Sequence, residues 1–116
     1  MNITIYHNPR CSKSRQTLEL LQQNKVEPII VEYLKTPPNH QQLDSILRGL
    51  EMEPRDLMRK KETDYLENNF DDDSLTRDQL IEMMIQYPKV IERPIVVAGD
   101  QIVIGRPPEN VLSVLA

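Results

Sequence analysis

The sequence predicts an α/β fold in which a βαβ unit is followed by an inserted helical region and then by a ββα unit. Two short apolar segments near the N-terminus, residues 2–6 and 29–33, enclose one stretch with helical periodicity. Two more apolar segments, residues 94–98 and 101–104, are separated by Gly99-Asp100. Between these pairs, capping signals and apolar residues spaced i, i+3, i+4, i+7 indicate helices rather than strands.

The N-terminal segment is predicted to form a strand–helix–strand unit. Ile3 and Ile5 alternate with polar residues, as in a half-buried strand. A helix from about Ser12 to Gln23 follows, and residues 29–33 are the second strand. A single helix of this length between two strands implies that they pair in parallel with a right-handed crossover.

Capping and turn residues predict two helices in the middle of the chain and a hairpin after them. Asn39 precedes Gln42 by three positions and Thr76 precedes Gln79 in the same way, each before an apolar stripe, which is the pattern of a capping box. Gly99, first in a two-residue turn between apolar segments, predicts a β-hairpin.

A closing helix is expected after the hairpin. Pro107 suits its first turn, and Val111, Leu112 and Leu115 are expected to face inward. The whole order of elements is that of a thioredoxin-like sheet flanked by helices.

Size and composition limit the class of protein. A chain of 116 residues has the size of one domain, so residues 1–116 are expected to form a single domain. One cysteine excludes an internal disulfide, and with only two histidines a structural zinc site is not expected, so no metal is assigned. The net charge of −4 without a basic block argues against nucleic acid as a partner. Neither a signal-peptide pattern nor an apolar run of membrane length is present, so we expect a cytoplasmic protein with no membrane partner.

Cys11, the only cysteine, is the candidate nucleophile. Pro9 ends the preceding extended segment and Ser12 or Ser14 can cap a helix, so the thiol is expected at a helix N-terminus. Unpaired N–H groups and nearby cations there typically bring a thiol pKa to roughly 3.5–7.5 and also favour an oxyanion beside the sulfur. The alternative, a buried structural cysteine, fits poorly with the charged and polar flanking sequence. The neighbouring ionisable side chains are His7, Arg10, Lys13 and Arg15.

Three arginines far from Cys11 in sequence are candidate oxyanion ligands, because guanidinium groups bind oxyanions in a bidentate manner. Arg59 ends a helical patch, and Arg106 ends the predicted hairpin. Arg93 precedes Pro94 at the start of an apolar strand. In a thioredoxin-like sheet this loop lies near the cysteine loop, so Arg93 is expected near Cys11, with Pro94 as a candidate cis peptide. From the sequence alone, each arginine could instead be a surface charge.

Four motifs carry a resemblance to a known family. They are Ile-Tyr-His-Asn-Pro-Arg-Cys-Ser-Lys-Ser-Arg-Gln-Thr-Leu, Leu-Met-Arg-Lys-Lys, Glu-Arg-Pro-Ile-Val-Val and Ile-Gly-Arg-Pro-Pro-Glu-Asn-Val-Leu. With these motifs the chain resembles the glutaredoxin-coupled arsenate reductase family (ArsC-like), and most of all its short YfgD-like branch. The resemblance covers essentially the whole chain and implies a thioredoxin-like fold with an inserted helical region.

The resemblance also implies a site and a reaction. It places the family's catalytic cysteine on Cys11 and the oxyanion-binding arginines on Arg59, Arg93 and Arg106. The supporting residues that it implies are His7, Ser14 and Arg15. The implied reaction is attack of the thiolate on arsenate, displacement by glutathione with formation of arsenite, and resolution of the mixed disulfide by glutaredoxin. Glutathione is then a co-substrate, and no cofactor is bound.

Two departures from well-known members leave other functions open. Ser-Lys follows the cysteine where those members have Gly-Thr, and the chain lacks the C-terminal extension of longer members. One alternative is a thiol/disulfide or glutathione-linked reductase that acts on another substrate. Another is a non-catalytic Spx-like regulator that binds RNA polymerase. Residue 14 is serine, so the chain has no Cys-x-x-Cys pair, which argues against such a regulator and means that any disulfide requires an external thiol.

Overall fold

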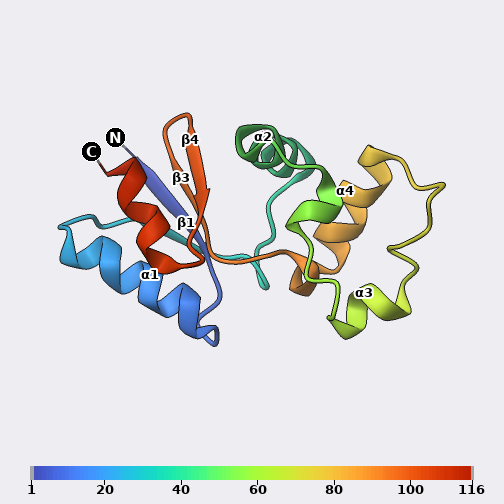
Figure 1. Cartoon of the computed structure of the whole chain (residues 1–116), viewed down its shortest axis with the longest axis horizontal. Helices are drawn as coiled ribbons and strands as arrows, with labels where there is room; N and C mark the ends of the chain where they lie inside the picture. Colours follow the sequence, from blue (N-terminus) through green and yellow to red (C-terminus); the bar gives the residue numbers. More distant parts are fainter. Residues whose placement is uncertain (1, 116) are drawn as a thin grey trace. The chain divides into compact units, whose positions relative to one another are not determined.

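The computed structural model describes residues 2–115, which divide into two units (Figure 1). Unit 1 combines the N-terminal segment up to Thr36 with the C-terminal segment from Arg93 onward. Unit 2, Pro37–Glu92, is inserted between these segments and corresponds to the predicted helical region. The expectation that residues 1–116 form one domain stays a prediction.

Unit 1 is built on a four-stranded sheet. Its elements are β1 (Ile3–His7), α1 (Ser12–Gln23), β2 (Ile29–Glu32), β3 (Ile95–Ala98), β4 (Gln101–Ile104) and the 3₁₀ segment η3 (Pro108–Val114). The strand order is β2-β1-β3-β4, with β1 parallel to β2 and with β3 antiparallel to both β1 and β4. The predicted βαβ unit, its parallel pairing and the hairpin are therefore confirmed. Gly99 has φ of 64°, the left-handed conformation that the hairpin turn requires.

One apolar core joins the two halves of unit 1. Helices α1 and η3 contact each other and cover one face of the sheet (Figure 1). The buried residues of this core are Ile3, Ile5, Leu21, Val96, Ala98, Val111 and Val114. Full burial of an aliphatic side chain of this kind stabilises the fold by roughly 1.5–3 kcal/mol. The core therefore fixes the loop after β1 relative to the loops before β3 and after β4.

The closing segment differs from its prediction. It is a 3₁₀ helix, in which side chains three residues apart align, so Pro108, Val111 and Val114 form the buried face. Leu112, which was expected to face inward, is 44% exposed. Pro107 is the N-cap rather than a residue of the first turn, which begins at Pro108.

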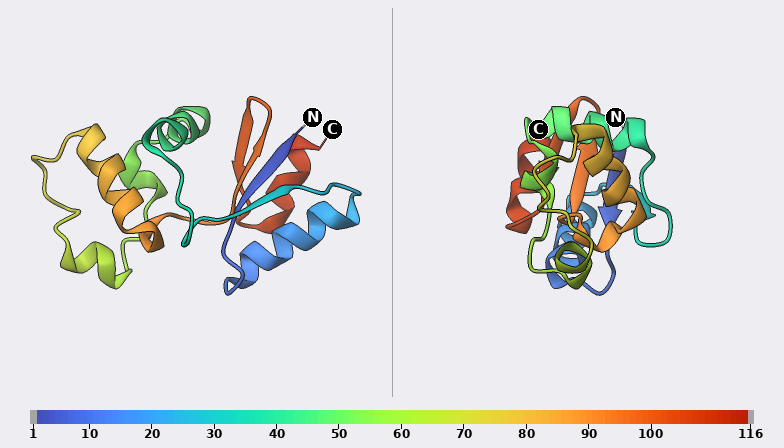
Figure 2. Two further views of the ribbon diagram at one scale, coloured as in Figure 1. Left: turned by 180° about the vertical axis from the view of Figure 1, so that it is seen from behind. Right: turned by 90° about the vertical axis from the view of Figure 1, so that its right-hand side faces the viewer.

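Unit 2 is helical (Figure 2). Its elements are α2 (His40–Leu50), η1 (Pro54–Leu57), α3 (Thr63–Glu67), α4 (Arg77–Gln86) and η2 (Pro88–Val90). Both predicted capping boxes are present: Asn39 and Gln42 bond each other at the start of α2, and Thr76 and Gln79 at the start of α4.

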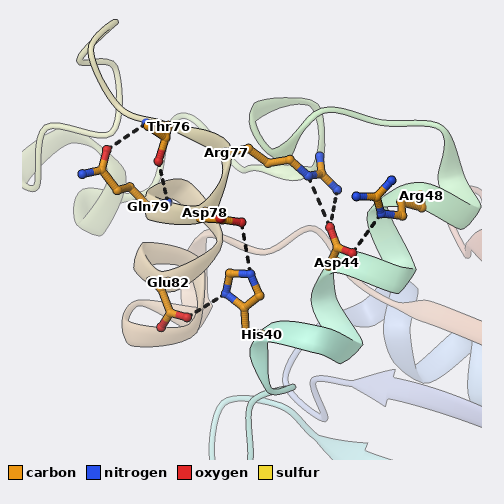
Figure 3. A network of polar contacts seen from close by, with 8 residues as sticks. All are labelled: His40, Asp44, Arg48, Thr76, Arg77, Asp78, Gln79 and Glu82. Atoms are coloured by element: carbon orange, nitrogen blue, oxygen red, sulfur yellow. Dashed lines mark hydrogen bonds and ion pairs between the residues drawn. The ribbon is translucent and has the colours of Figure 1, made fainter.

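Polar side chains connect α2 to α4 within unit 2 (Figure 3). The His40 ring lies 2.7 Å from a Glu82 oxygen through Nδ1 and 3.3 Å from an Asp78 oxygen through Nε2. One turn further along α2, Asp44 accepts a 2.8 Å hydrogen bond from Arg77 of α4. Each helix also buries apolar side chains, which are Leu43, Ile46 and Leu47 of α2 and Leu80, Ile81 and Met84 of α4.

Candidate active site

Three loops of unit 1 converge at one edge of the sheet. Strand β3 is antiparallel to β1, so it begins at the edge where β1 ends. Strand β4 is antiparallel to β3, so it ends at that same edge. These loops carry Cys11, Arg93 and Arg106 respectively. The topology therefore brings together three of the residues that the sequence predicted for the site.

Cys11 lies at the start of α1, as predicted. It is the N-cap residue, with extended backbone angles, and no side chain caps the helix. The expectation that Ser12 or Ser14 would cap α1 is therefore wrong. The Cys11 N–H donates a 3.0 Å hydrogen bond to the carbonyl of Asn8, which closes the loop between β1 and α1. Cys11 is a free cysteine, and the residue is half-buried.

The surroundings of Cys11 favour the thiolate. Burial acts to raise the pKa of the Cys11 thiol, but hydrogen bonds to the sulfur from the backbone of Ser14, the side chain of Arg93 and the backbone of Lys13 outweigh it. The pKa is therefore lower than that of an ordinary cysteine. Lys13 and Ser14 are in the first turn of α1, so their N–H groups belong to the unpaired donors that every helix start presents.

Two guanidinium groups lie at the sulfur. The Arg93 side chain hydrogen-bonds the Cys11 sulfur. The sequence had predicted only that Arg93, just before β3, lies near Cys11. Arg106 places Nη1 3.7 Å from Cys11 Sγ. The peptide bonds Arg93–Pro94 and Arg106–Pro107 are both cis. The first was expected, whereas nothing in the sequence distinguished the second.

The hydroxyl of Ser14 makes hydrogen bonds with residues at the end of β1 and in the loop between β1 and α1. Ser14 is fully buried, and its Oγ lies 2.6 Å from Nδ1 of His7 and accepts a 3.0 Å hydrogen bond from the Asn8 N–H. Burial lowers the pKa of His7, opposed by the charge of Glu32 and assisted by that of Arg15. The ring is therefore biased toward its neutral form, whose Nδ1 can accept the Ser14 O–H.

Sequence reasoning missed the role of Asn8. Its carbonyl accepts from Cys11 N–H, its side-chain Oδ1 accepts from Arg10 N–H at 3.0 Å, and its own N–H bonds Ser14. An asparagine before proline at a strand end is a typical turn residue, and this was the available signal.

Two predicted site residues have other contacts. The Arg15 guanidinium donates a 3.0 Å hydrogen bond to the Pro9 carbonyl and so braces the loop. Arg59 belongs to unit 2, where its guanidinium lies 3.6 Å from carboxylate oxygens of both Glu62 and Glu92. Its role as a third oxyanion ligand stays a prediction.

Residues 2–115 contain no group of three or more His, Cys, Asp or Glu side chains arranged to hold a metal ion. Nor is any helix in this range long and apolar enough to cross a membrane.

A four-stranded sheet of this order, with a cysteine at the start of the first helix, is a thioredoxin-like fold. Residues 6–114 match the ArsC family, and the chain belongs to this family.

Named relatives and a solved structure agree with this assignment. The protein YfgD of Escherichia coli K12 is 53% identical over 114 residues, which are 97% of this chain and 96% of YfgD. An arsenate reductase from Haemophilus influenzae is 43% identical over 116 residues, covering 99% of this chain and all of the relative. The structure of an arsenate reductase from Vibrio cholerae superimposes with a TM-score of 0.93 at 46% identity, covering 98% of each chain.

Proposed function

We propose that this protein is an arsenate reductase that converts arsenate to arsenite with glutathione and glutaredoxin. The observation that carries the proposal is the half-buried Cys11, whose thiol has a lowered pKa and whose sulfur has the Arg93 and Arg106 guanidinium groups beside it. The names of the Haemophilus and Vibrio relatives supply the substrate class. A thiolate among cationic and N–H donors suits attack on a small oxyanion.

In the first step, the Cys11 thiolate attacks the arsenic atom of arsenate. A sulfur–arsenic bond forms, and one arsenate oxygen leaves as water after taking up protons. Arg93 and Arg106 hold the remaining oxygens, since guanidinium groups offer pairs of donors with the required geometry. We include Arg59 as a third oxyanion-binding arginine, on the basis of the family resemblance alone.

In the second step, the thiolate of glutathione attacks the Cys11 sulfur. A sulfur–sulfur bond forms while the sulfur–arsenic bond breaks, and the electron pair of that bond stays on arsenic. Arsenic(V) thereby becomes arsenic(III), which leaves as arsenite, and the two sulfur atoms supply the two electrons. Glutaredoxin then removes glutathione from Cys11 by thiol–disulfide exchange. An external thiol is needed for this step because the chain has no second cysteine. A pool of reduced glutathione is characteristic of the cytoplasm, where we expect the reaction to occur.

The test is arsenate-dependent consumption of NADPH with glutathione, glutathione reductase and glutaredoxin present. Turnover is expected with the wild type and not with Cys11→Ser, because a hydroxyl without a general base is a poor nucleophile. Omission of glutathione or of glutaredoxin should each stop turnover. An inactive wild type whose Cys11 still reacts with an alkylating agent would overturn the proposal. NADPH consumption with a glutathionylated peptide in place of arsenate would then favour a glutathione-linked reductase with another substrate.

A further inference from the structure

Gly105, the residue before Arg106, is enclosed on two sides. Its N–H donates a 2.9 Å hydrogen bond to the carbonyl of Pro94. Its carbonyl accepts a hydrogen bond from the hydroxyl of Thr17 on α1, at 3.2 Å. A Cβ atom added at Gly105 would lie 2.5 Å from Thr17 Oγ1 and 2.8 Å from Pro94 Cγ. The chain can therefore approach α1 this closely only because residue 105 has no side chain.

Thr17 is fully buried, although it is polar. Its hydroxyl lies 2.8 Å from the Lys13 carbonyl as well as 3.2 Å from that of Gly105. A hydroxyl has one proton, so the two carbonyls share it. The Lys13 carbonyl is within α1, whereas the Gly105 contact joins α1 to a segment 88 positions away. The contact to Gly105 is thus the one that affects the position of the loop after β4.

Asn110 of η3 holds the same segment through the neighbouring carbonyls. Its side-chain Nδ2 donates to the carbonyls of Ile104 and Arg106, each at 3.2 Å. An amide has two N–H groups, so both bonds can form at once. The side chains of Thr17 and Asn110 therefore donate hydrogen bonds to three consecutive carbonyls, those of residues 104, 105 and 106.

These contacts have a consequence for the reactive sulfur. Arg106 is exposed and has a long side chain, so the position of its backbone decides how often its guanidinium meets Cys11. A fixed backbone reduces the conformational entropy lost when the 3.7 Å contact forms.

We propose that Thr17 and Asn110 are positioning residues, which hold the segment from Ile104 to Arg106 so that the Arg106 guanidinium lies against the Cys11 sulfur. Neither residue touches the sulfur, and both act through Arg106. The inference deepens the proposed function and rests on it for the identity of the reaction. The two residues come from different motifs of the sequence, one in α1 and one in η3.

The first experiment is a titration of the Cys11 thiolate, from the absorbance at 240 nm and from the rate of alkylation by iodoacetamide across pH. Thr17→Val keeps the shape of the side chain and removes the hydroxyl, and Asn110→Ala removes the amide at an exposed position. Each is expected to raise the pKa of Cys11 by up to about half a unit, because a less fixed Arg106 lies near the sulfur for less of the time and a unit charge at about 4 Å in water shifts a pKa by less than about one unit. Thr17→Ser, which keeps the hydroxyl, should restore the wild-type titration.

The matched control is Asn24→Ala. The Asn24 side chain donates a 2.8 Å hydrogen bond to the Leu20 carbonyl at the other end of α1, so it is an exposed amide–carbonyl contact of the same kind. Its removal is expected to leave the titration unchanged. Thermal unfolding shows whether each variant is folded. If Thr17→Val does not fold, Asn110→Ala, at an exposed position, still tests the inference.

A double-mutant cycle distinguishes positioning from a general effect on the fold. In an Arg106→Ala background, Thr17→Val and Asn110→Ala should no longer shift the pKa of Cys11. Equal shifts with and without Arg106, or no shift in either background, would overturn the inference. The titration requires no arsenate, so an absence of arsenate reduction in the wild type would refute the proposed function without deciding this inference.

Discussion

Nη1 of Arg106 lies 3.7 Å from Sγ of Cys11, although the two residues are 95 positions apart in the sequence. The contact follows from the sheet order, because β1 and β4 end at the same edge and the shared core fixes the loops after them. A positive charge at this distance stabilises the thiolate and can bind an anion that approaches it.

Replacement of Arg106 by lysine is expected to weaken substrate binding more than it changes the thiol. Lysine keeps the charge but loses the planar pair of donors, so the KM for arsenate should rise about tenfold, a cost of roughly 1.4 kcal/mol. The pKa of Cys11 should stay within a few tenths of a unit of the wild-type value. Steady-state kinetics and thiol titration measure the two effects. Arg48→Lys, at an exposed position paired with Asp44 in unit 2, is the matched control. An unchanged KM for Arg106→Lys would contradict the assigned role.

Reactivity of Cys11 should persist to lower pH than that of an ordinary cysteine. Burial opposes ionisation, but the hydrogen bonds from Ser14, Arg93 and Lys13 lower the pKa of the thiol in the folded protein. The alkylation rate should therefore reach half its maximum at a lower pH than for an ordinary cysteine, whose pKa is about 8.5. The same titration in urea removes these contacts and should return the pKa to its ordinary value. Coincident curves for the folded and unfolded protein would show that the contacts do not act on the thiol.

Local signals in the sequence predicted much of this structure. Each capping box depends on two residues three positions apart, and the hairpin depends on Gly99 at the turn. The bounds of α1 were likewise predicted from neighbouring residues, as was the place of Cys11 at its start. In each case the interacting residues lie within a few positions of each other, so the pattern is visible in the sequence.

The remaining features depend on contacts between distant segments. The family resemblance implied Ser14 as a supporting residue. The buried hydrogen bonds of Ser14 and Thr17 could not be predicted from the sequence pattern, because their partners include a residue of β1 and Gly105 after β4. Leu112 was misplaced because an apolar stripe does not by itself distinguish α from 3₁₀ spacing. The approach of Arg106 to Cys11 depends on the strand order of the sheet, and the periodicity of apolar residues does not predict that order.

Phe70 is expected to be a main contributor to the stability of unit 2. It is fully buried, its ring stacks on Tyr65 with centroids 5.3 Å apart, and it makes a T-shaped contact with the Tyr87 ring, with centroids 6.0 Å apart. Phe70→Ala should lower the free energy of unfolding by about 3–5 kcal/mol, because it leaves a cavity between two aromatic rings. Leu66→Ala, at a position 69% exposed, should change it by less than about 0.5 kcal/mol. Urea denaturation of both variants gives the comparison, and similar losses for the two would refute this account of the packing.

The contact of His40 with α4 should make stability depend on pH (Figure 3). The hydrogen bond to Glu82 raises the pKa of His40 above its ordinary value of 6.5. Desolvation opposes this shift, and the charges of Glu82 and Asp78 add to it. Folding therefore favours the protonated ring, so its stabilisation is complete below pH 6.5 and is lost as pH rises through the raised pKa. The melting temperature of the wild type should exceed that of His40→Gln at pH 5.5, and the difference should shrink by pH 8.5. Salt at 0.5 M should reduce the difference at pH 5.5, since these charges are exposed. A difference that stays constant or grows with pH would contradict the assignment.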